Sequence, residues 1–148
     1  SEYVKRIVEE LSRQEIEFVP YEDTELAPPP LRAETLSLLE KAKSSGITQI
    51  LLTNDASKWL GDKWWETWPQ IHFFDDVLDV KNIGFRKPHP EAYLACLNII
   101  DAPANDCLFV DDLHVNCSGA EAVGMRSYWF DISDPKAAAA GLSSYLGV

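Results

Sequence analysis

The sequence predicts an α/β protein of three layers, in which a mostly parallel, doubly wound sheet is covered by helices on both faces. From residue 33 to residue 146, stretches with the apolar period of helices alternate with short apolar runs rich in strand-forming residues. This alternation is typical of right-handed β-α-β units. Two of the apolar runs end in polar residues, at Thr53-Asn54-Asp55 and at Asp111-Asp112. Because the active crevice of such sheets lies beyond the carboxyl ends of the strands, these residues are the first candidates for a site.

The individual elements follow from the same patterns. Helical periods predict helices over residues 2–14, 33–44, 91–99, 117–123 and 137–146, and apolar runs predict strands over 47–53, 73–78, 107–110 and 126–130. Residues 80–90 are expected to form a loop stiffened by Pro88 and Pro90. Residues 16–19 stay ambiguous, since Pro20 argues against a central strand there. Four tryptophans within residues 56–68 favour core or lid packing over a base-stacking platform.

Length and composition predict a single soluble globular domain. The chain has 148 residues, 46% of them hydrophobic and 25% charged, without an apolar run of the roughly 18 residues that a membrane span needs. Its formal net charge of −11 disfavours nucleic acid and anionic membranes as partners and suits a cation site. The charged, helical start is unlike a secretory signal, and Cys96, Cys107 and Cys117 lack metal-site or redox-motif spacing. We therefore expect reduced, packed thiols in a cytoplasmic protein.

The acidic pair Asp111-Asp112 directly follows the apolar run Leu108-Phe109-Val110. Two adjacent carboxylates repel each other and resist burial unless a cation, a base or water compensates, and a divalent metal would do so. The alternative is that both are solvated loop residues, one of which caps a helix beginning near Asn116. The pair alone does not decide between these readings.

Three groups are expected to converge at the strand ends. They are a hydroxyl and an amide at Thr53 and Asn54, a cation at Lys87, and the carboxylates of Asp111 and Asp112. A phosphate needs donors and positive charge around its oxygens, and a metal beside it needs anionic oxygen ligands. The set supplies both, so it predicts a site for a phosphorylated ligand with a metal ion.

Residues 31–135 resemble the haloacid dehalogenase superfamily, in particular the members with a D-D pair in the last motif. The run L-L-T-N-D is similar to the second motif, G-F-R-K-P-H-P-E-A-Y to the third, and L-F-V-D-D-L-H-V-N-C-S-G-A-E-A-V-G-M to the fourth. The resemblance implies catalytic roles for Lys87 and Thr53 and a phosphoryl site formed by Thr53, Asn54 and Lys87. It further implies Mg²⁺ bound by Asp111 and Asp112, with Asn116 supporting the loop or capping the next helix.

The start of the chain departs from the family pattern, which begins with a strand ending in D-x-D whose first Asp is the nucleophile. The only candidate is I-E-F-V-P-Y-E-D-T-E-L at 16–26, which offers Glu22 and Asp23 without that spacing. Residues 1–30 resemble the end of a helical cap, and residues 31–148 the core. In the family the absent strand lies between those ending at Thr53 and Asp112. Either these two strands pair directly, or residues 16–19 fill the place, or a second copy or other partner chain does.

Three functions are compatible with these residues. The first is a phosphatase-type hydrolase that uses Mg²⁺ on a small phosphorylated substrate through an aspartyl-phosphate. The second is a catalytically inactive relative that binds ligands or partners. The third, a receiver-like signalling domain, is disfavoured because the acidic pair comes late in the chain.

Overall fold

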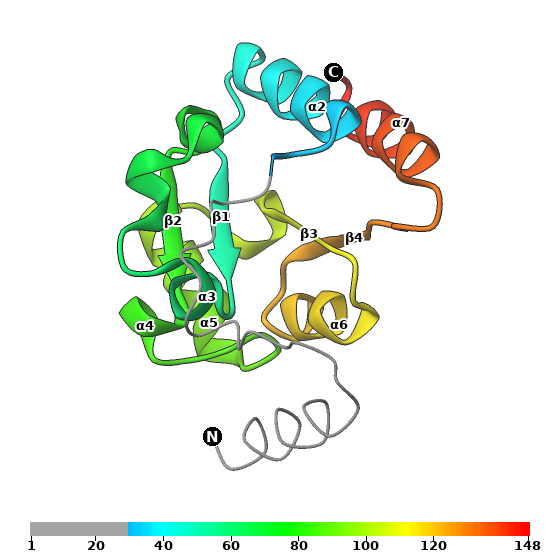
Figure 1. Cartoon of the computed structure of the whole chain (residues 1–148). Helices are drawn as coiled ribbons and strands as arrows, with labels where there is room; N and C mark the ends of the chain where they lie inside the picture. Colours follow the sequence, from blue (N-terminus) through cyan, green and yellow to red (C-terminus); the bar gives the residue numbers. More distant parts are fainter. Residues whose placement is uncertain (1–29) are drawn as a thin grey trace, which may run out of the picture.

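A computed structural model describes residues 30–148 and shows alternating helices and strands (Figure 1). In chain order the elements are α2 (Ala33–Ser44), β1 (Ile50–Thr53), α3 (Ala56–Leu60), the 3-10 helices η2 (Trp64–Thr67) and η3 (Pro69–Phe73), β2 (Asp76–Asp79), α4 (Val80–Ile83), α5 (Pro90–Ile100), the 3-10 helix η4 (Ala104–Asp106), β3 (Leu108–Asp111), α6 (His114–Ala122), β4 (Arg126–Trp129) and α7 (Pro135–Leu146). The predicted helix at 2–14 and the ambiguous run at 16–19 lie outside the described residues.

The predicted elements within residues 30–148 are present, with shifts at their ends. The helix predicted at 33–44 is confirmed at both ends as α2. The strand predicted at 47–53 pairs only from Ile50, and α6 begins three residues before the predicted residue 117. The loop expected at 80–90 was wrong in its first part, which forms the short helix α4. There the carboxylate of Asp79 caps the helix by accepting the N–H of Lys81, and Gly84 ends it in the left-handed conformation.

The strands form two separate parallel pairs, β1 with β2 and β3 with β4. Leu52 lies opposite Leu78 in the first pair, and Asp111 lies opposite Trp129 in the second. The parallel α/β prediction is therefore confirmed, but β1 and β3 do not pair with each other. Direct pairing, one of the three alternatives for the open place between them, was wrong. The ammonium of Lys87 donates a hydrogen bond to one backbone carbonyl oxygen of β1, that of Leu52. Filling by residues 16–19, which lie outside the described part, or by a partner chain stays a prediction.

Hydrophobic packing connects the two pairs of strands even though no ladder does. One cluster contains Leu52 of β1, Leu78 of β2 and Phe109 of β3, together with Tyr93 of α5, which is fully buried. A second cluster forms around Trp64, Trp68 and Val77. Leu51 and Leu52 belong to different clusters, so the two faces of the β1–β2 pair are both covered by apolar residues, as expected for a doubly wound sheet.

The aromatic and cysteine predictions are confirmed for the residues whose side chains are described. Trp64 and Trp68 are buried, with ring centroids 5.4 Å apart, so they serve packing. Cys96, Cys107 and Cys117 are buried and free. Among residues 30–148 no helix is long and apolar enough to cross a bilayer.

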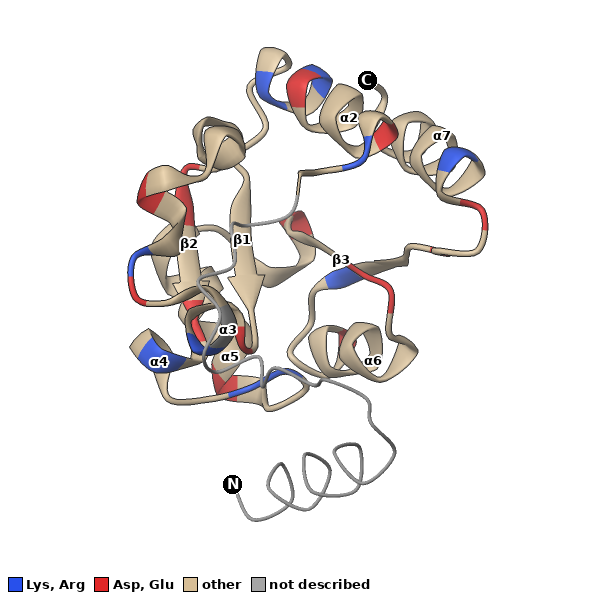
Figure 2. Cartoon of the chain, viewed as in Figure 1, with Lys and Arg blue, Asp and Glu red and all other residues tan. Residues whose placement is uncertain are grey.

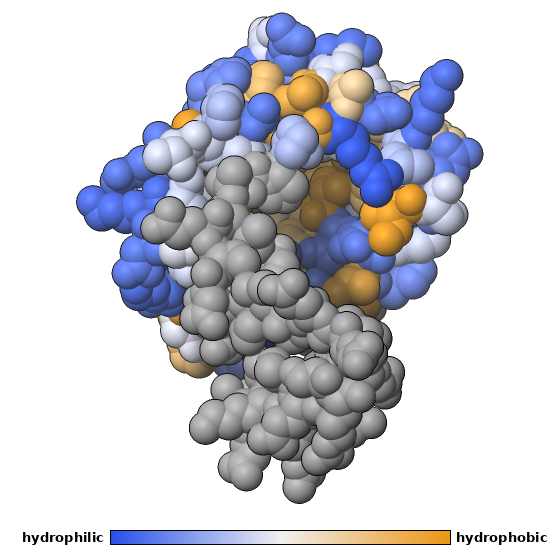
Figure 3. Space-filling view, viewed as in Figure 1, coloured by the Kyte–Doolittle hydropathy of each residue, from blue (hydrophilic) through white to orange (hydrophobic). Residues whose placement is uncertain are grey.

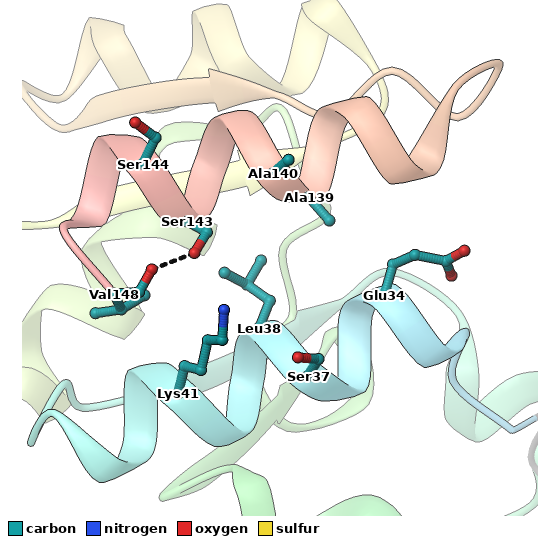
Figure 4. A pocket seen from close by; sticks show the side chains of 9 residues that line it. All are labelled: Glu34, Ser37, Leu38, Lys41, Ala139, Ala140, Ser143, Ser144 and Val148. Carbon is teal, nitrogen blue, oxygen red and sulfur yellow. Dashed lines mark hydrogen bonds between the residues drawn. The ribbon is translucent and has the colours of Figure 1, made fainter.

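A groove of about 420 Å³ lies between α2 and α7. Figure 4 shows the small side chains of Ala139, Ala140 and Ser143 on one wall and Leu38 and Lys41 on the other. Strand β1 points away from α2 in Figure 1, so this groove is not at the carboxyl end of that strand. It results from small residues at a helix contact and is separate from the site.

Gly119 of α6 packs closely against the loop that carries Lys87. A Cβ atom there would lie 2.7 Å from the hydroxyl oxygen of Tyr93 and 2.9 Å from the carbonyl oxygen of Pro88. The absence of a side chain at this residue therefore sets how near α6 comes to residues 87 and 88.

We expect Gly119→Ala to destabilise the protein. Alanine favours a helix over glycine by about 1 kcal/mol, but overpacking against a backbone oxygen costs about 1 to 3 kcal/mol. The clash outweighs the propensity, and urea unfolding should show a net loss of about 1 kcal/mol or more. The control is Ser118→Ala at the exposed neighbouring residue, with a change within about 0.5 kcal/mol. Unchanged or increased stability of Gly119→Ala would contradict the close contact.

Candidate active site

Lys87 contacts two of the other predicted site residues, Asn54 and Asp111. Its ammonium nitrogen lies 2.8 Å from Oδ2 of Asp111 at the end of β3 and 3.0 Å from the backbone carbonyl oxygen of Leu52 in β1. The side chains of this ion pair are only 13% and 7% exposed. The ammonium also lies 5.5 Å from the centre of the Phe109 ring. Lys87 thus joins the carboxyl ends of two strands that share no ladder.

Asn54 holds the backbone of Lys87 rather than pointing to an open site. Its Nδ2 donates to the carbonyl oxygen of Lys87 at 3.1 Å, and its Oδ1 accepts the N–H of Lys87 at 2.8 Å. Both ends of the carboxamide are therefore used by one residue 33 positions away in the sequence. The predicted contact of Asn54 with substrate stays a prediction, while the structure shows that it positions Lys87.

Asp111 is a buried carboxylate with three donors. In addition to the bond from Lys87 to Oδ2, its Oδ1 accepts hydrogen bonds from Nδ2 of Asn116 at 2.9 Å and from the backbone N–H of Leu113 at 3.0 Å. Burial raises the pKa of Asp111, but the hydrogen bonds from Lys87, Asn116 and Leu113 and the charge of Lys87 outweigh it and hold the pKa below its ordinary value. Asp111 is therefore ionised at neutral pH.

Asn116 links helix α6 to the end of β3 through its hydrogen bond to Asp111, and its supporting role in a site stays a prediction. It is buried, and it connects Asp111 to Tyr93, whose hydroxyl donates to the carbonyl oxygen of Asn116 at 2.7 Å. Burial, with a smaller contribution from the charge of Asp111, raises the pKa of Tyr93 to about 12. The Tyr93 hydroxyl is therefore protonated at neutral pH and fixes the main chain of Asn116.

Asp112 differs from Asp111 in its exposure and in the partners of its carboxylate. It is exposed, and within residues 30–148 its carboxylate has no hydrogen bond or ion pair. Its backbone carbonyl accepts the indole N–H of Trp129 at 2.8 Å, which fixes the main chain at this turn. Figure 2 marks the acidic residues that follow β3. In the described part of the chain, no group of three or more His, Cys, Asp or Glu side chains is placed to hold a metal ion.

Thr53 is the last residue of β1. Its hydroxyl oxygen accepts a hydrogen bond from the backbone N–H of Ala56, with 3.3 Å between oxygen and nitrogen. A hydroxyl that accepts one hydrogen bond still carries its own proton. Among the predicted site residues, Thr53 therefore retains a donor for a ligand.

Two interactions near the strand ends were missed from the sequence. Asp79 is 2% exposed, and its two oxygens accept the N–H groups of Ser57 at 3.1 Å and Lys81 at 3.0 Å. An aspartate directly after the predicted strand 73–78 was the available signal, the same as at Asp111. Arg86 pairs with Asp55 on the surface, its Nη1 lying 2.9 Å from Oδ1. These groups fix the segments on either side of Thr53 and Lys87.

Lys87 is thus buried between the ends of two strands of an α/β fold, where it is paired with Asp111, and the next residue, Asp112, is exposed. A sequence model of the haloacid dehalogenase-like hydrolase family matches residues 2–124. The chain belongs to this family, and the resemblance seen in the three motifs is confirmed.

Curated relatives cover only parts of the chain. It is 32% identical over 97 residues to a sesquiterpene phosphatase of Aspergillus oryzae, which is 63% of this chain and 47% of that protein. It is 36% identical over 59 residues to the glyceraldehyde 3-phosphate phosphatase of Pyrococcus abyssi, which is 39% of this chain and 25% of that protein. The chain thus spans less than half the length of these relatives.

Solved structures show the same fold. An uncharacterised protein from Corynebacterium glutamicum matches with a TM-score of 0.65 and 28% identity over 76% of this chain and 80% of that one. An L-2-haloacid dehalogenase matches with a TM-score of 0.68 and 20% identity over 86% of this chain and 58% of that one.

Removing the charge of Lys87 should strongly destabilise the fold. Lys87→Met keeps the length of the side chain but leaves the Asp111 carboxylate buried without its counter-ion, so we expect a loss of about 3 to 5 kcal/mol. Urea unfolding of Lys87→Met, Asp111→Asn and the double variant forms a double-mutant cycle. The double variant should lose clearly less than the sum of the two. Additive losses would mean that the pair does not interact.

Asn54→Ala should expose the backbone N–H of Lys87. We expect exchange of that amide hydrogen to become about tenfold faster, the equivalent of one ordinary hydrogen bond, as followed by NMR. Asn54→Asp is the matched control, because it keeps an acceptor for this N–H and should retain most of the protection. Equal exchange in all three proteins would show that Asn54 does not hold Lys87.

Proposed function

We propose that this chain carries the phosphate- and cation-binding part of a phosphatase-type hydrolase that acts with Mg²⁺ on a small phosphorylated substrate. The observation that carries the proposal is the ammonium of Lys87, 2.8 Å from Asp111, which is followed in the chain by Asp112 with an exposed carboxylate. Phosphatases among the relatives support the reaction class. Because the chain spans only part of those proteins, the substrate is proposed here as a chemical class.

Each side chain would have a distinct task on a phosphoryl group. The hydroxyl of Thr53 donates to one phosphoryl oxygen, since its own oxygen already accepts Ala56. Lys87 supplies positive charge that stabilises the negative charge of the phosphoryl group and its transition state. Asn54, Asn116 and Tyr93 keep Lys87 and Asp111 in place through the hydrogen bonds described above.

The residues present fit Mg²⁺. This ion is usually held by one or two carboxylates, waters and substrate phosphate, so it needs no larger protein cage. Asp112 offers an exposed carboxylate. In Asp111, Oδ1 already accepts two hydrogen bonds, whereas Oδ2 accepts one, from Lys87, and so keeps a lone pair. When bound, the ion supplies charge stabilisation to the phosphoryl oxygens.

The alternative is a catalytically inactive binding or interaction module. It is favoured because most carboxylates at the described strand ends are already bound within the fold and are not free to react. Asp55 is paired with Arg86, and the two oxygens of Asp79 are used as helix caps. Within residues 30–148, Asp112 is thus the only strand-end carboxylate without a partner.

Hydrolysis of p-nitrophenyl phosphate by the 148-residue chain separates the two functions. Mg²⁺-dependent turnover that Asp112→Asn abolishes would establish the hydrolase. Binding of Mg²⁺ and inorganic phosphate without turnover would establish the binding module.

We expect the chain to bind inorganic phosphate in the presence of Mg²⁺, as measured by calorimetric titration. Thr53→Val should weaken phosphate binding roughly tenfold or more, since a hydrogen bond to a charged group contributes about 1.5 to 3 kcal/mol. Thr53→Ser keeps the hydroxyl and is the control. Asp112→Asn should weaken Mg²⁺ binding. If neither Mg²⁺ nor phosphate gives heat, the proposed site is wrong.

A further inference from the structure

Exposed hydrophobic side chains lie close in the chain to the acidic turn after β3 or to Trp129, which binds that turn. Leu113, Val115, Trp129 and Ile132, here called the apolar rim, are each at least 42% exposed. They come from the turn into α6, the end of β4 and the segment that follows it. Figure 3 shows a hydrophilic area inside a hollow of the viewed face, with hydrophobic surface next to it. Single exposed apolar residues need no explanation, but four that lie within three residues of Asp112 or of its partner Trp129 do.

The rim is held in a fixed relation to Asp112. The indole N–H of Trp129 donates to the carbonyl oxygen of Asp112 at 2.8 Å, and the ring of His114 stacks on Trp129 with centroids 4.2 Å apart. The backbone N–H of Leu113 is bound to Asp111. Leu113 and Trp129 are therefore tied directly to the acidic pair, so a ligand bound at Asp112 is expected to meet this part of the rim.

We propose that the substrate is a phosphate monoester of an apolar alcohol, whose hydrocarbon part lies on the apolar rim while its phosphate lies at Thr53 and Lys87. The inference rests on the proposed function and adds the class of the alcohol. An unpaired carboxylate in the middle of the surface fits an amphiphilic ligand better than another protein, because the centres of protein interfaces are depleted of charged residues. A ligand with a phosphate and a hydrocarbon part matches both halves of this surface.

The test compares alkyl phosphates with the 148-residue chain in Mg²⁺ buffer. Octyl phosphate, kept below its aggregation concentration, should bind at least about tenfold more tightly than methyl phosphate, since burying two methylenes already accounts for such a ratio. The variant Val115→Ser/Ile132→Ser should lose this ratio while keeping its affinity for methyl phosphate. Ile99→Ser, at an exposed isoleucine of α5, is the control and should keep the ratio.

Each other outcome overturns the inference and identifies its fault. Equal binding of the two esters rejects the apolar alcohol but leaves the phosphate site standing. An octyl preference that persists in Val115→Ser/Ile132→Ser places the hydrocarbon elsewhere. Absence of binding by both esters and by inorganic phosphate rejects the proposed function and the inference with it. Self-association in sedimentation velocity that Val115→Ser/Ile132→Ser removes, without an octyl preference, assigns the rim to a contact between copies.

Discussion

The ammonium group of Lys87 is the interaction on which the arrangement of the strand ends depends. It binds a backbone oxygen of β1 and a carboxylate of β3, two strands that share no ladder. A buried ion pair is not by itself evidence of stability, because desolvation of both charges opposes their attraction. Here additional donors satisfy Asp111, and Asn54 fixes the main chain of Lys87. The pair therefore has the supporting hydrogen bonds that make a buried charge tolerable.

Asp111 and Asp112 show how two adjacent identical residues acquire different chemistry. The alternation of a strand turns Asp111 inward, where Lys87 and Asn116 stabilise its charge. Asp112 comes after the last strand residue and faces outward, so it keeps its hydration and its free oxygens. The repulsion expected for adjacent carboxylates is relieved because one of the two is neutralised by a lysine. One dipeptide thus holds a buried carboxylate that is paired within the fold and an exposed one whose oxygens are free within residues 30–148.

Local patterns in the sequence were sufficient for most elements, while contacts between distant residues were not visible. The period of residues 33–44 and the polar ends at Thr53 and Asp111 follow from side-chain chemistry over a few residues, and the structure agrees with both. Helix α4 was missed because it depends on a cap by the carboxylate of Asp79. The predicted strand ends at residue 78, so Asp79 was not recognised as the residue that joins the strand to a helix. The pairing of Asn54 with Lys87 spans 33 residues. The open place between β1 and β3 depends on tertiary placement, which no local pattern encodes.

The shared hydrophobic cluster beneath the two pairs of strands has a consequence for ligand binding. Apolar packing is non-directional, so it keeps the halves together without fixing how they are aligned. The hydrogen bonds of Lys87 are directional, and in the proposed function its ammonium is also the group that an incoming anion would contact. An anion that draws Lys87 away from Leu52 would loosen the alignment, and by thermodynamic reciprocity any change in alignment would alter affinity for the anion. Recognition of the ligand and the geometry of the sheet are then one coupled equilibrium.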